Sequence, residues 1–185
     1  MAHVASPDGR VLIRFSIENI GNEVGCPTYA VSYKGASVVL SSRLGLVLAG
    51  AADLRHHFEL CDVAYSEHEE TWTPLYGERH VILNNYREMT VDLRETVPPF
   101  RRMQLVFRAY DEGATFRYGI PSHDGVEEIA IWREVTEFHF PAGCYAYEEH
   151  GTEGEYFRKP VAEIAPDCER PLTVEYPDGK VACLV

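Results

Sequence analysis

The chain has 185 residues, of which 45% are hydrophobic and 25% are charged, a composition typical of one soluble globular domain. Its formal net charge of −12 argues against nucleic acid and anionic membrane surfaces as partners, because both require clustered Lys and Arg. No run approaches the about 20 apolar residues of a membrane-spanning helix. Residues 1–6 lack the regions of a signal peptide. We therefore expect either a cytoplasmic protein or an exported one whose signal is absent from this chain.

Apolar and polar residues alternate along two segments. In the first, apolar side chains occupy positions 11, 13, 15 and 17, with Arg14 and Ser16 between them. In the second, Met89, Val91 and Leu93 alternate with polar neighbours. Such alternation predicts strands with one face on a core and the other in solvent.

Two further pairs of β-type runs are joined by turn signals. Residues 103–110 and 115–120 flank the short polar segment 111–114, which predicts a hairpin. Residues 172–176 and 181–185 flank a Pro-Asp-Gly-Lys turn, which predicts another.

Helical periodicity is almost absent, and short turns near 52–56 and 161–164 are the best helical candidates. Many short strands with frequent turn signals indicate an all-β sandwich. We see no linker, repeat or low-complexity tract, so we expect a single domain over residues 1–185.

Five cysteines occur at positions 26, 61, 144, 168 and 183. The number is odd and no Cys-x-x-Cys pair exists, so neither a zinc site nor a redox motif is expected. We expect small buried thiols, as is typical of free cysteine, with one unassigned disulfide as the alternative.

The segment 147–156 is rich in ionisable side chains. Four carboxylates and one histidine lie within ten residues that include two glycines. Hard oxygen ligands on a flexible loop suit calcium, which takes six to eight of them. The alternative is a solvated acidic loop whose side chains spread apart. We expect this loop to be poorly ordered until partners fix it, because its charges repel and it has few apolar anchors.

Aromatic side chains offer a second candidate site. Trp72, Tyr76 and Trp132 could stack on sugar rings, although Trp and Tyr more often pack half-buried, and we expect packing for both tryptophans. Adjacent His56 and His57 would point to opposite faces of a strand and form a poor chelating pair.

Several segments resemble one protein family in the same order along the chain. They are Pro27–Tyr33, Ser42–Leu46, Glu70–Glu78 (ETWTPLYGE), Asn85–Val91 (NYREMTV) and Phe107–Tyr118. Together they resemble the N-terminal domain of the family-97 glycoside hydrolases, a family of α-glucosidases and α-galactosidases.

This resemblance implies a β-supersandwich of mainly antiparallel sheets, of the galactose-mutarotase type. It implies a non-catalytic domain that packs on a (β/α)8 barrel, which is absent from this chain, while the barrel carries the groups that act on an α-linked gluco- or galacto-oligosaccharide. Family members continue beyond the matching region for several strands, so we expect an incomplete sandwich and leave open whether this chain alone is an enzyme. Members are typically exported, which favours a periplasmic or secreted full-length protein.

The resemblance also implies one metal ligand. In the family, a glutamate of the N-terminal domain reaches a calcium ion from a Glu-Tyr pair, which matches Glu155-Tyr156 here, ahead of the triplet Ala162-Glu163-Ile164. The spacing is about two residues shorter than in the family, so Glu153 is the alternative. Since the other ligands lie on the barrel, we expect calcium in the full-length enzyme and no metal on this chain alone. Trp72 is the candidate for substrate contact.

Two other functions stay open. A freestanding carbohydrate-binding module would suit an all-β chain with exposed aromatic side chains. A mutarotase-like enzyme would need an acid–base pair, such as His139 with a glutamate, on a concave sheet face.

Overall fold

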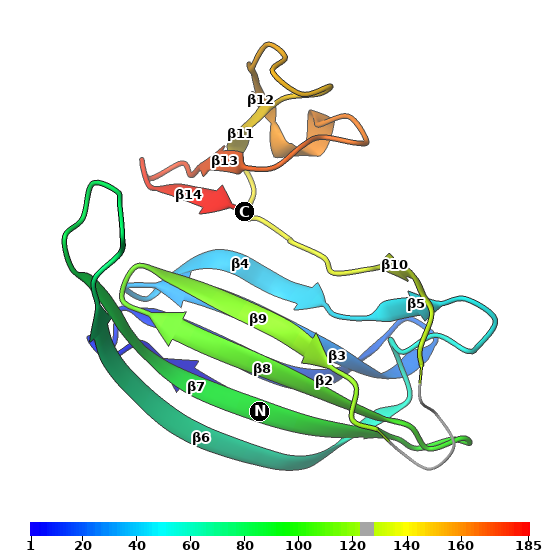
Figure 1. The fold of residues 1–185 in the computed structure, drawn as a ribbon. Helices are drawn as coiled ribbons and strands as arrows, with labels where there is room; N and C mark the ends of the chain where they lie inside the picture. The colour runs from blue at the N-terminus through cyan, green and yellow to red at the C-terminus, as the bar shows by residue number, and fades with distance from the viewer. Residues whose placement is uncertain (123–127) are drawn as a thin grey trace.

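The computed structural model describes residues 1–122 and 128–185, and its main body is a β-sandwich (Figure 1). One antiparallel sheet contains, in order, β1 (Ala2–Ala5), β2 (Val11–Ile20), β3 (Glu23–Tyr33) and β4 (Ala36–Arg43). The facing antiparallel sheet contains β6 (Phe58–Trp72), β7 (Ile82–Glu95), β8 (Arg102–Tyr110) and β9 (Gly113–Gly119). The predicted all-β sandwich of mainly antiparallel sheets is confirmed.

Two smaller sheets complete the described fold. Strand β5 (Leu46–Leu48) pairs with β10 (Ile131–Glu134). A four-stranded C-terminal sheet has the order β12 (Phe157–Pro160), β11 (Tyr145–Glu148), β13 (Leu172–Glu175) and β14 (Val181–Leu184). Both predicted hairpins, β8–β9 and β13–β14, are therefore confirmed.

The two predicted helical turns have different outcomes. The turn expected near 161–164 forms the 3-10 helix η1 (Val161–Glu163). The one expected near 52–56 is wrong, because Leu54 exchanges two backbone hydrogen bonds with Leu46 as an isolated antiparallel bridge. No helix in the described residues is long and apolar enough to cross a bilayer.

The core lies between the two sheets of the sandwich. Ile13 and Phe15 of β2 are buried against the facing sheet, where Met89 and Val91 of β7 are buried. The rings of Phe15 and Phe107 lie with centroids 6.0 Å apart. The period-two pattern thus selects the core face as predicted, and each such buried side chain stabilises the fold by about 1.5–3 kcal/mol.

A buried ion pair fixes the connection between β7 and β8. Nε of Arg101 donates to Oε2 of Glu95 at 2.7 Å, and both side chains are almost fully buried. The Arg101 guanidinium also donates to the carbonyl oxygen of Ala52 at 2.7 Å. The pair therefore joins this connection to the segment between β5 and β6.

Strands β6 and β7 extend past the rest of their sheet. Strand β8 pairs with β7 only as far as Tyr86, which lies opposite Tyr110. Residues 82–85 pair with β6 alone, and the loop that joins β6 to β7, residues 73–81, stands away from the sandwich as the green loop in Figure 1.

The C-terminal sheet packs on the sandwich through a small cluster of its own. Ala146, Val174 and Tyr176 are buried, and they contact Val38 and Phe140. The Tyr176 hydroxyl donates to the carbonyl oxygen of Val38 at 2.9 Å. An apolar hollow of about 610 Å³ remains between the C-terminal sheet and the open side of the sandwich.

Candidate functional site

The acidic loop between β11 and β12 begins with a buried glutamate. The Lys159 ammonium donates to Oε1 of Glu148, and the backbone N–H of Ala165 donates to Oε2 at 3.0 Å. These two hydrogen bonds, that of Lys159 first, hold the pKa of the Glu148 carboxyl below its usual range. Glu148 is therefore a structural anion and is not available to a ligand.

The next glutamate closes the loop on itself. The backbone N–H of Gly154 donates to Oε1 of Glu149 at 2.7 Å, and the N–H of Glu169 donates to the Glu149 carbonyl oxygen at 3.0 Å. The Glu169 carboxylate in turn accepts the N–H groups of Gly151 and Thr152 at 3.0 and 3.1 Å. Two carboxylates thus bind the backbone of the loop instead of repelling one another in solvent.

The hydrogen bonds to the Glu149 and Glu169 carboxylates hold the loop in an unusual backbone conformation. Gly151, Thr152 and Glu153 have φ values of +85°, +54° and +61°. Side-chain-bearing residues rarely adopt the left-handed region, so such conformations persist where surrounding contacts impose them. The hydrogen bonds to Glu169 are the contacts that do so here.

The two predicted calcium ligands lie at the open end of this loop. Glu155 and Glu153 are both exposed. In the described part of the chain, neither carboxylate has a hydrogen bond or ion pair, and no three His, Cys, Asp or Glu side chains gather as a metal-binding group. The structure therefore separates two buried structural glutamates from two exposed free ones, a division that the sequence does not reveal.

The tryptophans are not packed as expected. Trp72 is 48% exposed near the end of the β6–β7 hairpin, and Trp132 is 71% exposed on β10. The packing prediction fails because each lies at the margin of a sheet: Trp72 lies beyond the end of β8, and Trp132 lies at a bulge in a two-stranded sheet. Neither lines the apolar hollow beside the C-terminal sheet or a second, smaller hollow of about 340 Å³ at the β13–β14 turn.

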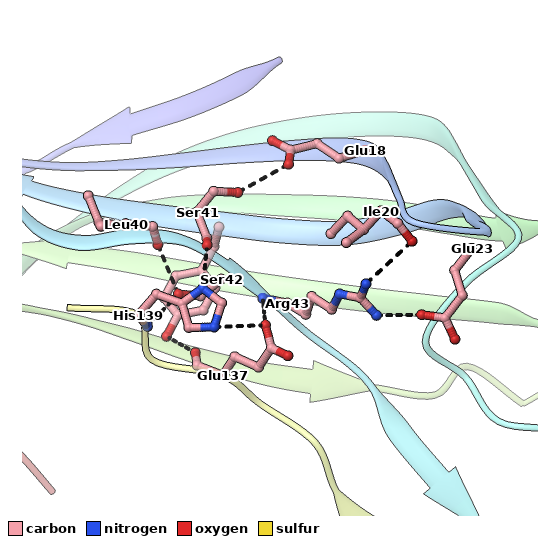
Figure 2. A network of polar contacts seen from close by, with 10 residues as sticks. Glu18, Ile20, Glu23, Leu40, Ser41, Ser42, Arg43, Glu137 and His139 are labelled. Carbon is pink, nitrogen blue, oxygen red and sulfur yellow. Dashed lines mark hydrogen bonds and ion pairs between the residues drawn. The ribbon is translucent and has the colours of Figure 1, made fainter. Parts of the chain in front are cut away.

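The histidine singled out for acid–base chemistry does meet a carboxylate, but on the outside of the molecule. Nε2 of His139 lies 3.4 Å from Oε2 of Glu137, and Figure 2 shows both beside the end of β4. Their neighbours Phe138 and Phe140 line the apolar hollow, whereas His139 and Glu137 do not. No described histidine lines either of these two hollows, so the convergence that a mutarotase-like enzyme requires is not formed there.

Figure 2 also shows a polar network that sequence reasoning did not find. The Arg43 guanidinium pairs with Glu23 and donates to the carbonyl oxygen of Ile20, while its backbone N–H donates to Oε2 of Glu137 at 3.1 Å. The partners lie up to 94 positions apart, so no local motif could have indicated them. The network joins β4 to the turn between β2 and β3 and to the segment after β10.

The remaining sequence candidates carry no site. All five cysteines are free, and only Cys26 and Cys144 are buried, so the expectation of buried thiols is wrong for the other three. His56 and His57 lie in a loop, not in a strand, with ring centroids 4.5 Å apart.

Comparison with known proteins gives a consistent picture. The model of the family described as glycosyl-hydrolase 97 N-terminal matches residues 4–185. A variant of a glycoside hydrolase family 97 enzyme from Pseudoalteromonas sp. strain K8, solved with panose, is 28% identical with a TM-score of 0.88, over 96% of this chain and 27% of that one. The enzyme in complex with acarbose has a TM-score of 0.87 at the same identity and coverage.

A more distant structure shares the fold. A β-arabinopyranosidase is 19% identical with a TM-score of 0.83, over 94% of this chain and 29% of that one. The chain thus spans between a quarter and a third of the length of these solved enzymes.

Proposed function

Because the chain belongs to the glycosyl-hydrolase 97 N-terminal family, we propose that it serves as the non-catalytic N-terminal domain of a calcium-dependent α-glycosidase. In this role it packs on a (β/α)8 barrel that carries the catalytic groups, and it supplies one glutamate to a calcium ion at the active site. The structural relatives, in which the matching region is about a quarter of the chain, support this role.

The observation that carries the proposal is the state of Glu155. Its carboxylate is exposed and has no partner among the described residues, while the backbone just before it is fixed by Glu149 and Glu169. A loop that internal hydrogen bonds hold in place and that presents a free carboxylate is what a site completed by another domain requires. Glu153, also free and exposed, is the alternative ligand.

The donor chemistry of Glu155 fits calcium, whereas the number of donors does not. Calcium prefers carboxylate oxygen and takes six to eight oxygen ligands. The described residues offer no cluster of three candidate ligands, so the remaining donors would come from the barrel and from water. Bound calcium would supply a fixed positive charge at the interface between the two domains.

The substrate and the compartment follow from the same proposal. Panose and acarbose are the ligands of the relatives' structures, and an α-linked gluco- or galacto-oligosaccharide is the substrate that we propose for the full-length enzyme. We also propose that this enzyme is periplasmic or secreted.

The decisive experiment compares Glu155→Gln with Glu163→Gln in the full-length protein. Glu163 is an exposed neighbour that serves as the matched control. We expect Glu155→Gln to lower calcium affinity and activity together while near-UV circular dichroism stays unchanged, and Glu163→Gln to change neither. If Glu153→Gln has the effect and Glu155→Gln does not, the ligand is Glu153; if neither has it, the proposed ligand role is wrong.

The isolated chain provides the second test. We expect no turnover of p-nitrophenyl α-glucoside or α-galactoside above the blank. Turnover by this polypeptide alone would contradict a non-catalytic role.

A further inference from the structure

The tip of the β6–β7 hairpin, residues 72–83, is the most exposed apolar part of the described molecule. Leu75 is fully exposed and Tyr76 is 90% exposed, and Trp72, Val81 and Leu83 are each about half exposed. Isolated surface hydrophobic residues are normal, but a contiguous set indicates an interaction site. Trp and Tyr are also the side chains that contribute most at protein interfaces.

The geometry of the hairpin indicates a recess as the binding partner, and not a flat surface. Trp72 lies opposite Ile82, and the neighbouring pair is Thr71 and Leu83. Successive side chains of a strand point to opposite faces, so Trp72 and Leu83 lie on opposite faces of the ribbon. Since Leu75 and Tyr76 occupy the end, apolar side chains surround the tip, and a partner must enclose it to cover them all.

No described part of the domain covers the tip of the hairpin. Residues 82–85 pair with β6 and not with β8, and the loop projects beyond the sandwich (Figure 1). None of the tip residues lines either of the two hollows described above. A sugar stacked on Trp72 or Tyr76 would therefore stay largely in solvent, whereas small-ligand sites bury most of their ligand.

Charge argues against a second copy of this chain as the partner. The net charge is −12, which disfavours self-association through long-range repulsion. At the tip, Glu78 and Arg79 are both exposed, and neither has an ion pair in the part of the chain that the structure describes. The tip thus carries charges of both signs, so a complementary partner would place polar side chains of both signs around an apolar recess.

We propose that the tip of the β6–β7 hairpin, residues 72–83, inserts into an apolar recess on the remainder of the full-length polypeptide. This inference rests on the proposed function, since it names the element through which the domain docks. The solved relatives support that choice of partner, because the region matched by this chain is only 27% of theirs.

Trp72 itself reports on the docking. The chain has two tryptophans, so Trp132→Phe leaves Trp72 as its only one. We would make this change both in the 185-residue chain and in the full-length protein, with any further tryptophan of the latter replaced by phenylalanine. We expect the acrylamide quenching constant of Trp72 to fall several-fold in the full-length protein and its emission to shift to shorter wavelength.

A double variant, Leu75→Ser with Tyr76→Ser, tests the apolar tip directly. In the full-length protein it should lower the melting temperature and restore quenching of Trp72. In the isolated chain it should change neither, because both side chains are already in solvent. Leu60→Ser is the matched control, since Leu60 is an exposed leucine on β6 away from the tip, and it should leave Trp72 quenching unchanged in both forms.

Four outcomes would overturn the proposal. Equal quenching of Trp72 in both forms means that the tip does not dock; if Glu155→Gln still lowers calcium affinity, the proposed function stands and only this docking surface is wrong. If malto-oligosaccharide lowers the acrylamide quenching of Trp72 in the isolated chain, the tip is a sugar-binding site and not a docking element. If the acrylamide quenching of Trp72 in the isolated chain falls as the protein concentration rises, the tip is a self-association surface. If the reading frame that encodes this chain encodes no further domain, the proposed partner does not exist and the proposal is wrong.

Discussion

The backbone N–H of Gly154 donates to Oε1 of Glu149 at 2.7 Å, which fastens the segment ahead of Glu155 to the end of strand β11. A carboxylate that accepts a backbone N–H in this way acts as an internal clamp, stronger than a neutral hydrogen bond. The acidic loop therefore has a built framework, and its two free glutamates project from it.

Replacing Gly154 by alanine should break this framework. A Cβ at this position would lie 2.6 Å from the His150 carbonyl oxygen and 2.9 Å from Oε1 of Glu149. Such overpacking costs about 1–3 kcal/mol, so the urea midpoint should fall. Gly113→Ala is the control, because a Cβ there meets nothing within 4 Å, and it should unfold at the wild-type midpoint or slightly above it. Equal urea midpoints for the two variants would show that the loop accommodates the added Cβ without loss of stability.

Removing Arg101 should destabilise the sandwich. The Arg101→Ala variant leaves the Glu95 carboxylate buried without its cation, which costs about 3–5 kcal/mol. Arg102→Ala, at an exposed neighbouring position, should change the free energy of unfolding by less than about 0.5 kcal/mol. Chemical denaturation followed by circular dichroism measures both, and a small effect of Arg101→Ala would mean that water reaches the pair.

The Glu148 site should give a defined pH dependence. Its folded-state pKa lies below the ordinary carboxyl value of about 4.3, chiefly through Lys159 and Ala165. The stability that it contributes is therefore complete above that ordinary value and is lost as the pH falls through the lowered pKa. We expect Glu148→Gln to lower the free energy of unfolding at pH 7 and to differ less from wild type at pH 3. Glu112→Gln, at an exposed position, should have little effect at either pH, and an equal effect of Glu148→Gln at both would refute the assignment.

Calcium should not stabilise the isolated chain. One free carboxylate at Glu155 supplies too few ligands, so millimolar calcium should leave the melting temperature unchanged in wild type and in Glu155→Gln alike. Differential scanning calorimetry with and without calcium provides the measurement. A calcium-dependent rise that disappears in Glu155→Gln would reveal a site preformed within this chain.

Sugar should not bind the isolated chain through Trp72. The side chain lines neither of the two hollows described above, and among the described residues no surface encloses it. Titration calorimetry with millimolar malto-oligosaccharide should therefore give no heat beyond dilution. Binding that Trp72→Ala abolishes and Trp132→Ala retains would instead support a freestanding carbohydrate-binding module.

The sequence by itself determined the class of fold. Alternation at Ile13, Phe15 and Val91 predicted which strand faces enter the core, and short turn signals predicted both hairpins. These features are local: the two-residue period of a strand and the backbone preferences of turn residues act over a few positions. The order of family-like segments added the domain family, which the match over residues 4–185 bears out.

Only the tertiary structure decided which acidic and aromatic side chains are free. Glu148 and Glu149 are next to each other in the same acidic run as Glu155, yet they are buried, and hydrogen bonds from Lys159, Ala165 and Gly154 compensate their carboxylates for the loss of water. Trp72 is exposed because β8 ends before it. In both cases the environment of a side chain depends on chain segments brought in by folding, and a charge or an aromatic ring carries no local sign of which partners will reach it.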